Sequence, residues 1–137
     1  QERNQKQQAL LAFVELWKRA WESDDVEHYL SFYSEKFRTG GSTYKSWAKR
    51  KRVLNKRIEQ RKIHISDLSI LESKNVVHVR FVQDYSSSNI TDIGMKELFI
   101  TQENGQYKII SENWSRLKSP QPATLQYAYQ DSEESAL

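Results

Sequence analysis

The chain has 137 residues and a formal net charge of +3; 37% of its residues are hydrophobic and 12% are aromatic. This length suits one domain with one core, and aromatic residues spread along the chain indicate a folded domain rather than a disordered one. The sequence contains no cysteine, which excludes disulfides, thiolate catalysis and cysteine-ligated metals, and no apolar run approaches the roughly 18 residues that span a bilayer.

Polar residues mark both ends of the chain. Residues 1–8 are polar and do not begin with Met, so we expect a polar linker within a longer protein. Residues 119–137 contain Pro120 and Pro122 followed by polar and acidic residues, which predicts a flexible tail. The folded domain is therefore expected to cover residues 9–118.

Three helices are predicted in the first half of the domain, at residues 8–22, 26–37 and 43–61. In each of them apolar residues recur at the three- and four-residue spacing of one helix face. Gly40-Gly41 is a turn signal between the second helix and the third.

Four strands are predicted after Lys62, where the apolar period changes to two. They cover residues 63–70, 77–85, 94–100 and 107–114. An irregularity is expected at Ser66-Asp67 in the first of them, and Asn104-Gly105 predicts a tight hairpin turn between the last two. The predicted fold is α+β: three N-terminal helices packed on one face of a curved four-strand antiparallel sheet, which together form a cone with an open mouth.

Several short motifs occur in a fixed order along this pattern. They are Trp17 and Trp21; Phe32-Tyr33-Ser34 with Phe37; Trp47 and Lys51; Val79, Phe81, Gln83, Tyr85 and Ser87; Lys96 and Leu98; and Glu112 with Trp114. In this order they resemble the nuclear transport factor 2-like superfamily, and within it the domain at the C-terminus of bacterial envelope L,D-transpeptidases and L,D-carboxypeptidases. The resemblance covers residues 10–117.

The resemblance implies a location in the bacterial periplasm or cell envelope. It also implies a domain that helps bind or position peptidoglycan for a fused or associated L,D-peptidase module, or that mediates assembly. Catalytic domains in such proteins often use a cysteine nucleophile. Because this chain has no cysteine, it does not supply that nucleophile itself.

Polar residues on the predicted half-buried strands indicate a ligand pocket inside the cone. Buried polar groups need partners, so they mark either a binding pocket or a hydrogen-bonded core network. The core alternative is a structural Lys96–Glu112 ion pair. The predicted pocket residues are Tyr29, Tyr33, Arg38, Gln83, Tyr85, Lys96, Glu112 and Trp114.

The third predicted helix and the residue after it carry nine basic residues against one acid, which leaves 12 basic and 17 acidic residues elsewhere. Such a patch attracts polyanions: peptidoglycan or another anionic envelope polymer, acidic phospholipid, or nucleic acid. Nucleic acid is disfavoured because the chain lacks zinc-finger spacing and a ribonucleoprotein aromatic signature. The alternative is a solvated helix face. The expected patch consists of Arg50, Arg52, Lys56 and Arg57.

Two further functions are open to this fold. In a small-molecule enzyme of the isomerase or hydrolase type, Tyr33 and Glu112 would shift protons, although Lys96 beside Glu112 would lower the pKa of that carboxyl. In an interaction module, the outer face of the sheet would form a homodimer. The three histidines show no metal-ligand spacing with a nearby carboxylate, and neither a metal nor a cofactor is expected.

Overall fold

The computed structural model describes residues 2–57, 60–88 and 90–117. Its helices are α1 (Glu2–Glu22), α2 (Val26–Leu30) and α3 (Tyr44–Arg57). Its strands are β1 (Tyr33–Thr39), β2 (Ser42–Thr43), β3 (Lys62–Glu72), β4 (Val77–Ser86), β5 (Thr91–Glu103) and β6 (Gln106–Arg116). None of these helices is long and apolar enough to cross a membrane, as far as the described residues go.

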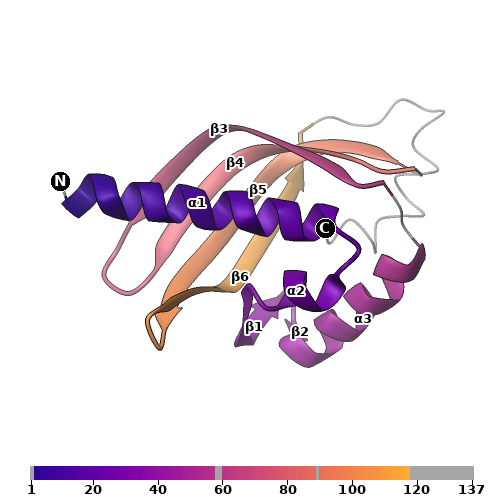
Figure 1. Ribbon diagram of the computed structural model, residues 1–137, viewed down its shortest axis with the longest axis horizontal. Coiled ribbons are helices and arrows are strands. Elements are labelled where there is room, and N and C mark those ends of the chain that lie inside the picture. Colours follow the sequence, from indigo (N-terminus) through magenta and orange to yellow (C-terminus); the bar gives the residue numbers. More distant parts are fainter. Residues whose placement is uncertain (1, 58–59, 89, 118–137) are drawn as a thin grey trace.

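The strands form one curved sheet in the order β2-β1-β6-β5-β4-β3. Strands β3 to β6 are the predicted antiparallel meander, whereas β1 pairs parallel with β6 and antiparallel with β2. Figure 1 shows α1 lying across the curved sheet, with α2, α3, β1 and β2 gathered at one end of it. The α+β class is confirmed, but the sheet has six strands and is mixed, not four-stranded and antiparallel.

The second predicted helix is wrong beyond Leu30. Asp25 caps the N-terminus of helix α2, because its side chain accepts a hydrogen bond from the backbone N–H of His28. The helix ends at Leu30, and the chain then extends into β1. Tyr29, Tyr33 and Phe37 are four residues apart, a spacing that suits one face of a helix. Four residues are also two full periods of a strand. Tyr33 and Phe37 therefore lie on the same face of β1, and both are buried.

The turn between β1 and β2 explains why this segment joins the sheet. Gly40 and Gly41 have φ values of 50° and 84°, and Thr39 pairs with Ser42 across them. Two consecutive positive φ angles are typical of tight hairpin turns, where glycine carries no steric penalty. The turn signal was predicted, but it closes a hairpin and does not separate two helices.

The first helix starts earlier than predicted. Residues 2–8 continue α1, so the expected polar linker is helical over that range. Gln, Lys, Arg and Glu are good helix formers, and Lys6 lies 3.7 Å from Glu72 at the end of β3. These residues extend the helix beyond the core, so they show no apolar stripe. The predicted tail, residues 119–137, lies outside the described residues.

The irregularity and the hairpin turn predicted in the meander are both confirmed. The β3–β4 register shifts between Ser66 and Ser69, and Asp67 has a φ of 52°. Asn104 and Gly105 have φ values of 54° and 79° in the hairpin between β5 and β6.

Aromatic side chains fill the space between α1 and the sheet. The Trp17 ring meets Phe81 edge-on at 5.9 Å, and the Trp21 ring lies 5.4 Å from Tyr85. Trp47 from α3 packs on Tyr33 at 4.4 Å. The inner face of the sheet is therefore a packed core over most of its area.

A substitution at Gly94 on β5 would test how tightly the inner face of the sheet is packed. A Cβ atom there would overlap the carbonyl oxygen of Ser115 and lie 2.8 Å from the Trp114 ring. We predict that Gly94→Ala lowers the free energy of unfolding by about 1–3 kcal/mol, the usual cost of overpacking. Denaturant unfolding measures this, with Thr91→Ala, at an exposed position of the same strand, as the control. Equal stability of both variants would contradict the packing described here.

Candidate functional site

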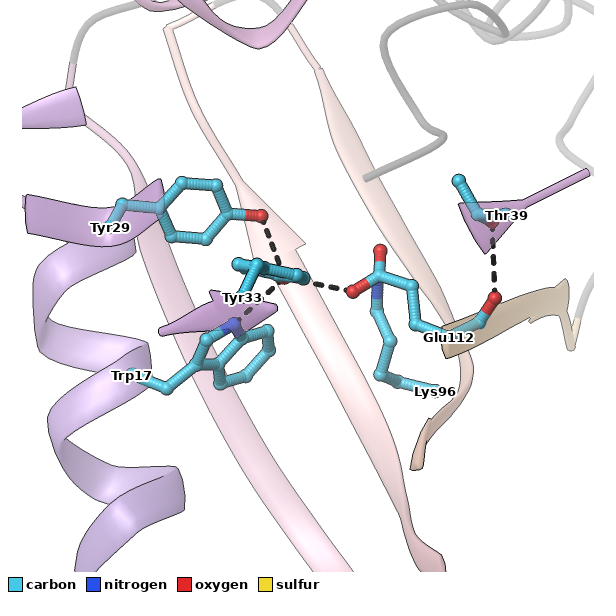
Figure 2. Close-up of polar contacts among 6 residues, drawn as sticks. All are labelled: Trp17, Tyr29, Tyr33, Thr39, Lys96 and Glu112. Carbon is cyan, nitrogen blue, oxygen red and sulfur yellow. Dashed lines mark hydrogen bonds and ion pairs between the residues drawn. The ribbon is translucent and has the colours of Figure 1, made fainter. Parts of the chain in front are cut away.

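A buried ion pair occupies the inner face of β5 and β6. Lys96 Nζ lies 3.1 Å from Glu112 Oε2, and the two side chains are only 1% and 4% exposed. The second carboxylate oxygen, Glu112 Oε1, accepts a hydrogen bond of 2.8 Å from the Tyr33 hydroxyl (Figure 2). Both oxygens of this carboxylate are thus engaged, and the ion pair expected as the core alternative is present.

Tyr33 connects this carboxylate to two helices. Its hydroxyl oxygen accepts a hydrogen bond from Trp17 Nε1 at 3.0 Å and lies 3.0 Å from the Tyr29 hydroxyl. Because Tyr33 donates its own proton to Glu112, Tyr29 must be the donor between the two hydroxyls. Burial, together with the charge of Glu112, raises the pKa of both tyrosines well above their usual range, so both stay neutral hydrogen-bond donors.

Tryptophan rings flank the ammonium group of Lys96. Its Nζ lies 5.4 Å from the centre of the Trp21 ring and 5.8 Å from that of Trp114, within the range of cation–π attraction. Burial lowers the pKa of Lys96, and the contact with Glu112 opposes this change. Apart from Glu112, the ammonium group of Lys96 therefore has mostly aromatic neighbours on the inner face of the sheet.

A second lysine reaches the same interior from α3. Lys51 is 5% exposed, and its Nζ lies 5.8 Å from the rings of Trp21 and Trp47. Burial lowers its pKa from 10.5 to about 7, and nearby cations, among them Lys96, act in the same direction, whereas Glu112 opposes them. An amine of this kind changes its charge near neutral pH.

Only a small cavity lies beside Lys51. Its volume is about 20 Å³, enough for roughly one water molecule. The residues that line it include Trp21, Tyr29, Lys51, Leu54, Arg61 and Tyr85.

The structure brings most of the predicted pocket residues together. Tyr29, Tyr33, Lys96 and Glu112 form the hydrogen-bonded cluster of Figure 2. Three others lie along the inner face of the sheet or at its margin: Gln83 and Tyr85 on β4 are fully buried, and Trp114 on β6 is half buried. Arg38 is exposed on β1 and does not line the cavity, because the segment that was expected to be helical is a strand.

The residues of the predicted basic patch differ in their contacts and in their exposure to solvent. Arg52 forms an exposed ion pair with Glu27 at 2.7 Å, and Arg50 is half buried, whereas Lys56 and Arg57 are exposed near the end of α3. The patch is therefore less uniform than the sequence indicated.

Two cations that the sequence assigned to that basic segment are buried. One is Lys51, and the other is Arg61, which donates to the carbonyl oxygens of Trp21 and Ser23 at 2.9 and 3.0 Å. Arg61 thereby binds the C-terminal end of α1, a usual partner for a basic side chain. The signal for Lys51 was its position within the apolar stripe of the third predicted helix. No comparable signal marked Arg61.

The comparisons with known proteins agree with this fold. Residues 9–113 match the family described as the Cds6 C-terminal NTF2-like domain. Bd1075 of Bdellovibrio bacteriovorus is 35% identical over 87% of this chain, with a TM-score of 0.79. The helical cell shape determining protein Pgp2 of Campylobacter jejuni is 33% identical over 75% of this chain, with a TM-score of 0.63.

This chain corresponds to only part of those two proteins, covering 43% of the Bd1075 structure and 39% of Pgp2. An NTF2-like protein of unknown function from Pseudomonas putida is covered over 98% of its length with a TM-score of 0.73, but at 9% identity it shows the fold alone. No curated protein matches the sequence.

The low pKa of Lys51 predicts a specific dependence of stability on pH. Unfolded lysine holds its proton up to about pH 10, whereas folded Lys51 loses it near pH 7. Between these values the unfolded state binds more protons, so the free energy of unfolding rises with pH, by at most about 1.4 kcal/mol per pH unit. We expect Lys51→Met to remove this rise, and so to exceed the parent in stability most clearly at pH 6.

Denaturant unfolding between pH 6 and 9.5 measures the effect, and Lys49→Met on the exposed side of α3 is the control. The control should follow the parent chain across this range. A constant difference between Lys51→Met and the parent at every pH would show that Lys51 does not titrate as described.

Proposed function

This chain belongs to the family of Cds6 C-terminal NTF2-like domains, and from this membership we propose that it is a non-catalytic binding domain of a bacterial cell-envelope protein. Its role is to bind or position peptidoglycan for an L,D-transpeptidase or L,D-carboxypeptidase module. The proposed location is the periplasm.

The polar inner face of the sheet is the observation that carries this proposal. Gln83, Lys96 and Glu112 are each at most 4% exposed, on strands whose other buried residues are mostly apolar. Replacing a buried ion pair by well-packed apolar side chains is often neutral or stabilising, so folding alone is a weak reason to keep these groups. A ligand that hydrogen-bonds to this face supplies a better reason.

The relatives support the accessory character of the domain. Pgp2 determines helical cell shape, and this chain is similar to somewhat over a third of it. The rest of such a protein has room for a separate catalytic module. A fused or associated L,D-peptidase module is accordingly the partner that we propose.

The contacts of Glu112 favour binding over catalysis. A general base must come within hydrogen-bond reach of the substrate proton, but this carboxylate already accepts from Tyr33 and Lys96 and its side chain is only 4% exposed. The putative scytalone dehydratase from Novosphingobium aromaticivorans shares the fold at 13% identity, which carries no activity to this chain.

Titration of the ¹⁵N-labelled domain with soluble muropeptides tests the proposed function. We expect signals from Tyr33, Lys96 and Glu112 to shift on addition of the ligand, and we expect the fragments to remain chemically unchanged. Glu112→Gln should weaken binding, because it removes the charge that orients Lys96 and Tyr33. Lys36→Gln, at an exposed position of β1, is the control.

The NMR spectrum of each variant must first show that it is folded. Unchanged spectra of the parent chain at millimolar muropeptide would refute the binding function. Conversion of the fragments by the parent chain that is lost in Glu112→Gln would favour an enzyme of the same fold.

A further inference from the structure

We infer that Lys51 is a site of covalent modification, at which the side-chain amine adds carbon dioxide and becomes a carbamate. The product is an anion on a side chain that otherwise carries a positive charge or none. The modified residue belongs to helix α3, and its chemistry does not depend on the proposed binding function.

The buried charges around Lys51 are short of one anion. Among the described residues, the buried charged side chains are Lys51, Arg61, Asp92, Lys96 and Glu112. The guanidinium group of Arg116 engages Asp92 at 2.7 Å. Three cations then remain with the single carboxylate of Glu112, and Arg61 has the partial negative charge of carbonyl oxygens in addition. Since buried charges are stable when they are paired, a further negative charge is favoured here.

A carbamate at Lys51 supplies that charge. An ammonium group contributes one positive charge and a carbamate one negative charge, so the two remaining cations face two anions. Loss of the proton alone leaves two cations with one anion. Arg61, Tyr29 and Tyr85 line the same cavity as Lys51, and their N–H and O–H groups are of the kind that donates to carboxylate oxygens.

The cavity beside Lys51 gives the reagent its access. Val26 of α2 and Asn55 of α3 line it and are half buried, so the cavity lies close to the surface of the molecule. Its volume is about 20 Å³, which suits a very small reagent. Carbon dioxide is uncharged and not much larger than a water molecule, so it can enter a space beside aromatic rings. Larger carbonyl compounds that react with amines do not fit.

The amine of Lys51 is reactive at neutral pH. Only an uncharged amine has the lone pair that attacks carbon, and burial lowers the pKa of Lys51 from 10.5 to about 7. The charged groups that act on it are Lys96, Arg50 and Arg61, which lower the pKa further, and Glu112, which raises it. An exposed lysine holds its proton almost completely at this pH.

The reaction needs neither an oxidant nor a cofactor. The lone pair of Nζ forms a bond to the carbon of carbon dioxide, and one C=O electron pair moves onto its oxygen. One proton then passes from the nitrogen to solvent water. A free amine and carbon dioxide thus give a carbamate and a proton, and acid reverses the reaction.

NMR with ¹³C-labelled bicarbonate tests the modification on a chain whose lysines carry ¹⁵N. At pH 8 we expect a carbamate carbon signal that is split by a directly bonded ¹⁵N, and its loss in Lys51→Met. Lys49→Met, at an exposed position of the same helix, is the matched control and should keep the signal. At equal dissolved carbon dioxide the signal should be about tenfold weaker at pH 6, because Lys51 then holds its proton.

Two further measurements use the parent chain and so do not depend on the folding of a variant. A trimethyloxonium salt converts a carbamate into its stable methyl ester, and peptide mass mapping should locate this ester at Lys51. Bicarbonate should raise the unfolding temperature above that in chloride of equal ionic strength and pH, because the modified folded state is removed from the unfolding equilibrium.

Other outcomes overturn the inference. Mass mapping that finds no ester at Lys51, or finds it equally on exposed lysines, would show that Lys51 is not a selective site. A split carbon signal that persists in Lys51→Met would assign the carbamate to another lysine. If chloride stabilises the parent chain as much as bicarbonate does, the cavity holds a free anion and Lys51 stays unmodified. None of these results alters the muropeptide titration, which uses no added bicarbonate.

Discussion

The structure depends on the way in which one buried carboxylate is neutralised. Glu112 on β6 receives Lys96 from β5 and Tyr33 from β1, and Tyr33 in turn is held by Trp17 of α1 and Tyr29 of α2. Leaving a charge without its partner in such a place costs several kcal/mol. The cluster is therefore stable only when five separate elements are in position together, and this requirement favours a single arrangement of helices around the sheet.

The buried charged side chains around this carboxylate are mostly positive. Lys51, Lys96 and Arg61 are all at most 6% exposed in the same interior as Glu112. Aromatic rings occupy most of the remaining space, and the cavity beside Lys51 has room for little more than a water molecule. The recognition that we propose for this site accordingly rests on a few polar atoms in a tightly packed interior and not on a wide hydrophobic cleft.

The sequence predicted the meander well because its signals are local. Period-two patterns identified β3 to β6, the Asn104-Gly105 turn has the positive φ angles that it requires, and polar residues at inward positions indicated Lys96 and Glu112. It failed at β1, because a four-residue spacing fits a helix and a strand equally well. The choice is made by pairing with β6, some 70 residues later in the chain, which no local pattern contains.

That long-range pairing has a consequence for the order in which the molecule forms. Tyr33 and Glu112 are 79 positions apart, and β1 has its main partner only in the last described strand. Contacts of this separation form late, since the intervening chain must first be brought together at an entropic cost. During synthesis, most of the domain leaves the ribosome before β6 exists. The nascent chain thus carries its aromatic helix and an unpaired β1 before the inner face is complete, so the surface that we propose for binding is the last part of the domain to form.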